Sequence, residues 1–406
     1  MWPRSNIMHS ILTIVQIAVE IVAVVGVVSS SLYYLLCLWG VSTFLRERQA
    51  NRNDRATRDP VRSNLPPISI LKPLRGTDPE IYESFRSHCL QDYPEYEIIF
   101  GVSDANDPAI ESVKALQREF PERRIQLVVS PTILGANVKV SNLAQMLPVA
   151  QHEYLIVNDS DIRVEPDYLR RVTAPLADLR VGMVTCLYRG VAAATLGSRL
   201  ESLGISTDFC AGVLAAFRLE GGIRFGLGST LAFRRVDLKK IGGFESISNH
   251  LADDYELGAR ISSLGVLVKL SDVVVETYLP PYRFAEFVAH QLRWSRGVRD
   301  VRAGGYFGLI FTFGILWALL AVLASERALW AWGALVSILF LRLGVALVVG
   351  RGVLRDRRVL KDVWLIPLRD LVAVAVWIIS LGGHTVTWRG DRFRLRDGKL
   401  TRIDSA

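Results

Sequence analysis

The sequence predicts an α/β protein in which a mostly parallel sheet lies between helices and is joined to transmembrane helices. Three observations lead to this prediction. Short apolar strand patterns alternate with helical patterns through the middle of the chain. Long uncharged segments flank that middle part at both ends. The 406 residues are 50% hydrophobic with a positive mean hydropathy, which suits one globular domain plus membrane segments better than two soluble domains.

The chain is predicted to begin with a membrane anchor at residues 1–45. Residues 21–45 carry no charge and exceed the roughly 20 residues that a membrane-spanning helix needs. A cleaved signal peptide has a shorter apolar core, so we interpret this segment as an uncleaved anchor. Residues 304–388 are predicted to hold two or three further spans. The candidate runs there are residues 306–324, residues 328–350 with Arg342 inside, and the shorter 370–388.

The distribution of arginines predicts which side of the membrane the middle domain occupies. A basic linker, residues 46–65, follows the first span, whereas only Arg4 precedes it. The positive-inside rule therefore places the middle domain, residues 66–280, in the cytoplasm. Basic residues within 351–361 agree, because two further crossings return the chain to the same side. A complete fourth crossing would export the basic tail, residues 389–406, against the positive-inside rule. Two alternatives follow. The last segment is interfacial or re-entrant, or the tail is exported despite its charge.

The net charge of +8 lies mostly in these juxtamembrane stretches. It indicates contact with anionic lipid headgroups rather than with nucleic acid, for which no motif is present. Lysines are rare among the 48 basic residues, which suits a GC-rich bacterial genome and thus a multi-pass protein of a bacterial inner membrane. The four cysteines have no metal-ligand spacing and are expected to pack in the interior.

The middle domain contains alternating strand and helix patterns that share one functional edge. Ligands of parallel sheets bind beyond the carboxyl ends of the strands, where Lys72, Asp104 and Asp159 lie. Asp104 also suits a simple turn, since its neighbours favour turns. The expected strands are residues 68–71, 96–102, 125–129 and 154–158, and the expected helices are residues 81–91, 108–120 and 140–147.

Two carboxylates follow the last of these strands. Side chains alternate along a strand, so Asp159 and Asp161 are expected to point to the same side. Two such oxygen ligands can hold Mg²⁺ or Mn²⁺ bridging a nucleotide-sugar diphosphate. The alternative is a solvated turn after the strand.

A second acidic cluster is a candidate for the general base. Asp254 lies between Asp253 and Glu256, whose negative charges disfavour its ionisation and raise its pKa. We choose Asp254 as the base, with Asp253 as its rival. The alternative is that one of them caps the helix that follows.

Two further segments carry candidate substrate contacts. Asn137, Lys139 and Asn142 follow a glycine turn and suit a uracil edge or a pyrophosphate, although a capped helix start explains them equally. An amphipathic helix at residues 281–303 leads into the next span and is expected to lie at the membrane interface, its arginines meeting lipid phosphates or the substrate diphosphate. Its aromatic residues Phe284, Phe287 and Trp294 are expected to line the approach of a lipid.

These motifs resemble those of the ceramide glucosyltransferase family, glycosyltransferase family 21, and of the related bacterial hopanoid-biosynthesis glycosyltransferases. The resemblance covers about residues 66–302. It rests on Leu71-Lys-Pro-Leu-Arg-Gly76, Gln91-Asp-Tyr-Pro94, Asp107-Pro-Ala109, Asn137-x-Lys139, Asp159-Ser-Asp-Ile-Arg-Val164, Asp253-Asp-Tyr255, Arg293-Trp294, and Trp388-Arg389 with Arg392-Phe-Arg-Leu395 in the tail.

The resemblance implies a nucleotide-sugar-binding domain of the GT-A type. It implies that Asp104 holds the nucleoside and that Asp254 acts as base in an inverting transfer. It also implies that Asp159 and Asp161 hold the metal and the diphosphate, over which Arg293 and Trp294 close the site.

One position departs from the family pattern. Where the family has glutamine or arginine three residues before the Arg-Trp pair, this chain has His290. Either His290 replaces that residue or the diphosphate contact differs.

The expected function is transfer of a hexose, glucose or N-acetylglucosamine, from a UDP-sugar to the hydroxyl of ceramide or a hopanoid in the bilayer. A processive polysaccharide synthase is an alternative, but it needs a channel for which three or four spans are too few. A non-catalytic nucleotide-binding scaffold is another, against which the complete set of acidic residues argues.

Overall fold

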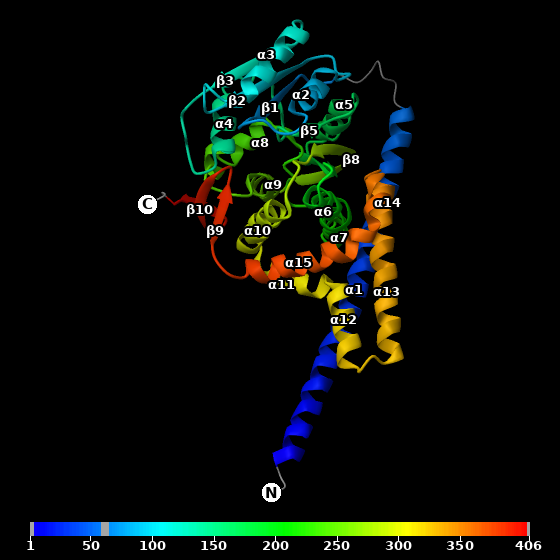
Figure 1. Cartoon of the computed structure of the whole chain (residues 1–406). Coiled ribbons are helices and arrows are strands. Elements are labelled where there is room, and N and C mark those ends of the chain that lie inside the picture. The colour runs from blue at the N-terminus through cyan, green and yellow to red at the C-terminus, as the bar shows by residue number, and fades with distance from the viewer. Residues whose placement is uncertain (1–3, 58–64, 404–406) are drawn as a thin grey trace.

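The computed structural model describes residues 4–57 and 65–403. Its α/β domain contains one eight-stranded sheet (Figure 1). The strands are β1 (Ile68–Pro73), β2 (Tyr96–Val102), β3 (Arg124–Val129), β4 (Tyr154–Val157), β5 (Ile162–Arg163), β6 (Val181–Val191), β7 (Leu231–Arg234) and β8 (Leu267–Tyr278). Their order is β3-β2-β1-β4-β7-β6-β8-β5. The first four in this order are parallel, as are β6 and β8, whereas β7 and β5 run antiparallel to their neighbours. The predicted mostly parallel sheet is confirmed.

Helices cover both faces of this sheet. They are α2 (Ile81–Cys89), α3 (Ala109–Glu119), α4 (Val138–Met146), α5 (Tyr168–Thr173), α6 (Leu196–Gly204), α7 (Cys210–Leu219), α8 (Arg235–Lys240), α9 (Asp253–Ser263) and α10 (Phe284–Val301). Consecutive strand residues belong to different cores, because side chains alternate along a strand. Ile70 packs in the core with α2, α3 and α5, whereas Leu71 packs in the core with α4, α7 and α9.

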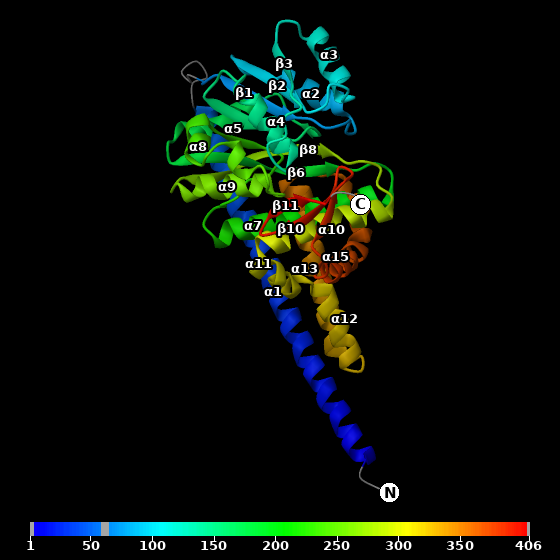
Figure 2. The same cartoon turned by 90° about the vertical axis from the view of Figure 1, so that its left-hand side faces the viewer.

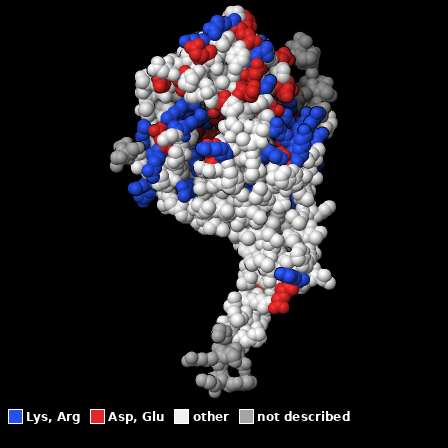
Figure 3. Space-filling view, viewed as in Figure 1, with Lys and Arg blue, Asp and Glu red and all other residues white. Residues whose placement is uncertain are grey.

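Below the domain, apolar helices form a bundle (Figure 1). They are α1 (Arg4–Thr57), α11 (Ala303–Gly308), α12 (Gly314–Ala324), α13 (Leu329–Ala346), α14 (Arg358–Asp362) and α15 (Ile366–Ser380). Among the described residues, four helical segments are long and apolar enough to cross a membrane, and a bent pair would make a fifth. Figure 2 shows α1 extending beyond α12. Figure 3 shows few charged side chains on the bundle and many on the domain above it.

The membrane segments differ from the prediction in three places. The run 306–324 is not one straight span, because its two helices bend by 51° at Phe313. Helix α1 continues through Thr57, so much of the basic linker is helical, and residues 58–64 lie outside the described residues. One candidate, Leu196–Leu219, was not predicted as a span, and 72% of its most apolar window is buried inside the protein.

The predicted basic tail is a folded part of the molecule. Strands β9 (Thr385–Trp388), β10 (Asp391–Arg396) and β11 (Lys399–Arg402) form a small antiparallel sheet, so the predicted last membrane run ends at Ser380 rather than at residue 388. Figure 1 shows this sheet beside α9 and α10. The tail therefore lies on the same side of the bundle as the α/β domain, and α15 packs against α10 and α6 instead of carrying the tail away.

Candidate active site

The turn after β4 carries Asp159 and Asp161. The strand ends at Val157, and the amide of Ile162 donates a hydrogen bond of 3.3 Å to the carbonyl of Asp159. The predicted reason for their alignment, alternation along a strand, is therefore wrong, because both residues follow the strand. The turn still keeps the two carboxylates close: burial, followed by the charge of Asp159, raises the pKa of Asp161 to about 6. The hydroxyl of Thr277 donates to the Asp161 carboxylate.

Asp254 is held beside Asp159 by a glycine. The amides of Gly228 and Tyr255 each donate a hydrogen bond of 2.8 Å to the Asp254 carboxylate. A β-carbon at Gly228 would lie 2.7 Å from an Asp159 carboxylate oxygen and 3.3 Å from one of Asp254, so the two carboxylates meet over a position without room for a side chain. Burial, with the neighbouring Asp253, raises the pKa of Asp254 to about 6.

Asp253 has different partners from Asp254. The ammonium of Lys139 lies 2.9 Å from Asp253 and 2.7 Å from Asp159. Burial alone would lower the pKa of Lys139, but the carboxylates outweigh it and keep the ammonium charged. Asn137 caps α4, is fully buried, and donates to the carbonyl of His250 at 2.8 Å and to Asp253 at 3.3 Å. Asn137 thus holds the loop before α9 and presents no accessible surface to a substrate.

Lys72 lies beneath the turn. Its side chain is fully buried, and its ammonium donates to the carbonyl of Asp159 at 3.0 Å. Burial lowers the pKa of Lys72 to about 7, against the attraction of Asp161, Asp159 and Asp78. Ser160 donates to Asp78, which fixes the other side of the same turn. Lys72 and Asp78 therefore hold the carboxylate turn in place through hydrogen bonds to Asp159 and Ser160.

Two predicted contacts lie apart from the carboxylate cluster. Asp104 follows β2, is exposed, and accepts a hydrogen bond of 2.8 Å from the amide of Asn106 in its own turn. It lies at the carboxyl edge of the sheet, as predicted, but no hydrogen bond or ion pair joins it to the cluster in the described chain. Asn142 is buried and donates to the carbonyls of Leu74 and Gly101, which makes it a structural residue.

Helix α10 brings His290, Arg293 and Trp294 to the site. His290 lies 3.4 Å from the carboxylate of Glu201 and packs against the Trp294 ring with centroids 5.3 Å apart. Gln291 donates to the same Glu201 at 2.8 Å. Glu201 is 1% exposed, so this buried carboxylate of α6 fixes the helix that carries all three residues.

Arg293 has no ion-pair or hydrogen-bond partner within the described residues. Burial lowers its pKa below the ordinary value of arginine, whereas Tyr282, Glu201 and Asp159 oppose that change. A desolvated guanidinium without a carboxylate partner is suited to binding an anion.

Glu201, Thr277 and Gly228 are absent from the predicted site residues. A signal existed for Glu201, because it is one of two carboxylates, with Asp208, inside a mostly apolar helical run. No signal in the sequence singles out Thr277, because strand β8 brings it to the turn from more than a hundred residues away.

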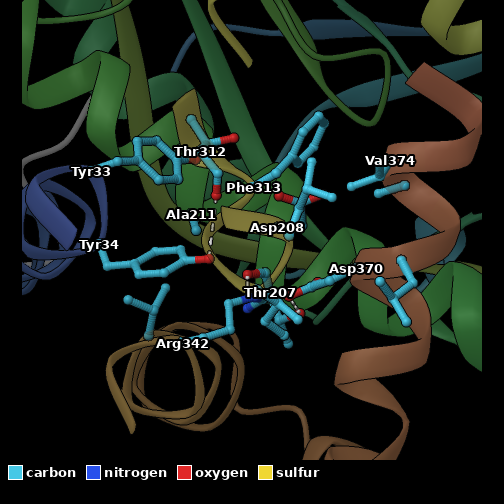
Figure 4. Close-up of a pocket in the computed structure, with 15 residues that line it drawn as sticks. Tyr33, Tyr34, Thr207, Asp208, Ala211, Thr312, Phe313, Arg342, Asp370 and Val374 are labelled. Atoms are coloured by element: carbon cyan, nitrogen blue, oxygen red, sulfur yellow. Dashed lines mark hydrogen bonds and ion pairs between the residues drawn. The ribbon is translucent and has the colours of Figure 1, made fainter. Parts of the chain in front are cut away.

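A second cluster of polar side chains lies within the bundle (Figure 4). Arg342 of α13 donates two hydrogen bonds of 2.8 Å to Asp370 of α15 and one of 3.0 Å to the carbonyl of Thr207. The hydroxyl of Tyr34 in α1 donates to the carbonyl of Thr312 at 3.3 Å. These contacts involve five separate segments, and a small cavity of about 30 Å³ lies between them.

Asp159 and Asp161 would offer carboxylate oxygens to one divalent cation. Part of this set is already engaged, because Lys139 pairs with Asp159 and Thr277 donates to Asp161. Mg²⁺ is commonly held by one or two carboxylates together with substrate phosphates. No set of three or more acidic, histidine or cysteine ligands is found among the described residues.

The sequence model that describes glycosyl transferase family 21 matches residues 22–401, nearly the whole chain. The chain belongs to glycosyl transferase family 21. This membership confirms the predicted resemblance. A ceramide glucosyltransferase of Caenorhabditis elegans is 24% identical over 235 residues, which are 58% of this chain and 51% of that protein. A ceramide glucosyltransferase of Komagataella phaffii is 34% identical over 109 residues, 26% of this chain and 21% of that protein.

This family 21 chain therefore spans about half the length, or less, of these curated relatives. A solved mannosyltransferase of Pyrobaculum calidifontis, in complex with GDP-Man and Mn²⁺, is 20% identical with a TM-score of 0.49. The alignment covers 86% of this chain and 99% of that one.

Proposed function

We propose that this family 21 chain is a membrane-bound inverting glycosyltransferase that moves a hexose from a UDP-sugar to the hydroxyl of a membrane lipid. One observation carries the proposal: the carboxylates of Asp159 and Asp254 meet across Gly228 at the edge of the sheet, beside α10 and above the apolar bundle. The ceramide glucosyltransferases among the relatives support a lipid acceptor. The acceptor is ceramide or a hopanoid, and the sugar is glucose or N-acetylglucosamine.

The donor side of the site stabilises the departing diphosphate. Asp159 and Asp161 would hold Mg²⁺ or Mn²⁺, which offsets the negative charge that develops on the phosphates. Arg293 supplies a positive charge that forms no ion pair within the described residues, although Glu201 and Asp159 lie near enough to interact with it. Asp104, exposed beyond β2, holds the nucleoside. Lys139 keeps Asp159 and Asp253 in place through its two ion pairs.

Asp254 removes the proton from the acceptor hydroxyl. Within the described chain its carboxylate accepts hydrogen bonds from two backbone amides and forms no ion pair, whereas Asp253 pairs with Lys139 and accepts a hydrogen bond from Asn137. A base whose pKa is near 6 is mostly ionised at neutral pH yet still accepts a proton in the transition state. Asp254 is therefore the better base of the pair.

The acceptor enters from the membrane surface. Each methylene of a lipid tail drawn out of the bilayer costs about 0.8 kcal/mol, so the tails stay in the bilayer while the hydroxyl reaches the site. Helix α10 lies between the carboxylates and the bundle, with Phe284 exposed and Trp294 packed beside His290. Phe287, also expected to line the approach, is fully buried in the core with Leu200 and Ile366 and is a packing residue instead.

The α/β domain and the tail sheet are proposed to face the cytoplasm of a bacterial cell. The basic residues within 351–361 and the tail lie on the domain side of the bundle, in agreement with the positive-inside rule (Figure 1).

The test uses the full chain in lipid nanodiscs that contain either ceramide or a hopanoid alcohol. Each nanodisc is supplied with UDP-glucose or UDP-N-acetylglucosamine and Mn²⁺, and the lipids are analysed by mass spectrometry. We expect one lipid–sugar combination to gain a single hexose, with equimolar release of UDP. A polysaccharide product, or UDP release that is independent of lipid, would contradict the proposal.

A further inference from the structure

The small C-terminal sheet presents an arginine in a strained conformation. Residues Arg389 and Gly390 form the two-residue turn between β9 and β10, and both have positive φ, +50° and +87°. Such turns favour asparagine or glycine at the first position, because a side chain there meets the backbone. Arginine at this position is unfavourable for the turn, which points to a role for its guanidinium outside the turn.

The sheet that carries Arg389 is fixed to the active site. The amide of Leu251 donates to the carbonyl of Gly398 at 3.0 Å, and the amide of Leu400 donates to the carbonyl of Asn249 at 2.7 Å, just before the acidic start of α9. The guanidinium of Arg296 in α10 donates to the carbonyl of Thr385 at 2.7 Å. The position of the β9–β10 turn is therefore set by the two elements that carry Asp254 and Arg293.

Arg389 lies close to the carboxylate turn through its contact with Asp78. Its guanidinium lies 3.4 Å from Asp78, the residue that accepts a hydrogen bond from Ser160 between the two candidate metal ligands. It is also close enough to Arg293 to lower the pKa of that arginine beyond the effect of burial. Both arginines therefore lie near the carboxylate turn, and Arg293 forms no ion pair among the described residues.

We propose that Arg389 binds the diphosphate of the nucleotide sugar together with Arg293. Like charges in proximity are stabilised when an anion lies between them, and two arginines match the oxygens of a diphosphate. The assignment rests on the proposed function and adds a residue of the tail sheet to its donor site. It explains why this sheet is folded against the α/β domain and why arginine occupies a turn that favours glycine.

The turn conformation gives a sharp test. Arg389→Gly removes the guanidinium but relieves the strain, so it does not weaken the turn. Asp397→Gly is the matched control: Asp397 has φ of +51° in the equivalent turn between β10 and β11, is highly exposed, and forms an ion pair with its neighbour Arg396. Binding of UDP to the full chain in nanodiscs with Mn²⁺ is measured by calorimetry, with the thermal midpoint of each variant.

We expect Arg389→Gly to weaken UDP binding at least tenfold without lowering the thermal midpoint, and Asp397→Gly to bind as the unchanged chain does. Arg389→Lys should fall between them, because lysine keeps the charge but not the planar fork. Unchanged UDP binding by Arg389→Gly, or equal losses in both glycine variants, would overturn the assignment while leaving the proposed function intact. Absence of UDP binding by the unchanged chain would instead overturn the proposed function, and the assignment with it.

Discussion

Replacing Asp254 with asparagine separates proton transfer from substrate binding. The side chain keeps its size and one accepting oxygen, but its new NH₂ group faces the amide of either Gly228 or Tyr255, which now donate to the carboxylate at 2.8 Å. The lost hydrogen bond costs about 0.5–1.5 kcal/mol of folding free energy. The variant should therefore fold and enter the membrane.

The effect on turnover is much larger. General-base catalysis contributes about 10²–10⁴-fold to a rate, so kcat should fall at least about 10²-fold while KM for the UDP-sugar changes little. Because burial raises the pKa of Asp254 to about 6, the carboxylate is about 90% ionised at pH 7 and about 10% at pH 5. The kcat/KM of the unchanged chain should therefore fall about tenfold between these pH values, and the variant should lose this dependence.

The assay is lipid-dependent UDP release from nanodiscs between pH 5 and pH 8. Asp161 titrates in the same range, so saturating Mn²⁺ is used to keep it ionised. The matched variant is Asp253→Asn, which keeps the base and should be milder. A kcat for Asp254→Asn within threefold of the unchanged chain would refute the reasoning, and the reverse order of the two variants would identify Asp253 as the base.

Three further predictions follow from the site and the bundle. Asp161→Asn should abolish sugar transfer while the protein remains folded, because an amide is a poorer ligand of Mg²⁺ or Mn²⁺ than a carboxylate. Chelation of the metal from the unchanged chain should have the same effect. Full activity in EDTA would exclude a metal. Phe284→Ser should raise the apparent KM for lipid alone, whereas Phe287→Ser should cost about 3–5 kcal/mol of stability, as thermal denaturation in nanodiscs would show. Asp370→Asn should destabilise the bundle by about 3–5 kcal/mol because it leaves Arg342 buried without its anion, and an unchanged thermal midpoint would contradict this.

Local patterns in the sequence predict the parallel half of the sheet, β1 to β4, but they do not predict β5, β6, β7 or β8. The strands at residues 68, 96, 125 and 154 are apolar runs separated by helical periodicity, and their parallel order follows from alternation. The turn carrying Asp159 and Asp161 is also local, so its position at the end of β4 is predictable. Its internal geometry is not, because it depends on Thr277 and Asp78, which come from distant elements.

Long-range contacts account for what the sequence does not reveal. The number of charged residues distinguishes the basic tail from a membrane span. It does not predict that alternating residues of β10 pack over Leu251, or that the side chain of Arg389 contacts Asp78. The segment Arg358–Ser380, which includes α15, has the length and hydropathy of a span, yet α15 packs against α10. Hydropathy measures transfer to lipid and carries no information on which helix another helix contacts.

The central claim, sugar transfer to a membrane lipid at the carboxylate site, is tested most directly in a host that lacks glycolipids. The full chain or its Asp254→Asn variant is expressed at matched membrane levels, and total lipids are analysed by mass spectrometry. The account predicts a lipid carrying one additional hexose with the unchanged chain and at least about 10²-fold less of it with the variant. No new glycolipid with the unchanged chain, or equal amounts from both proteins, would contradict it.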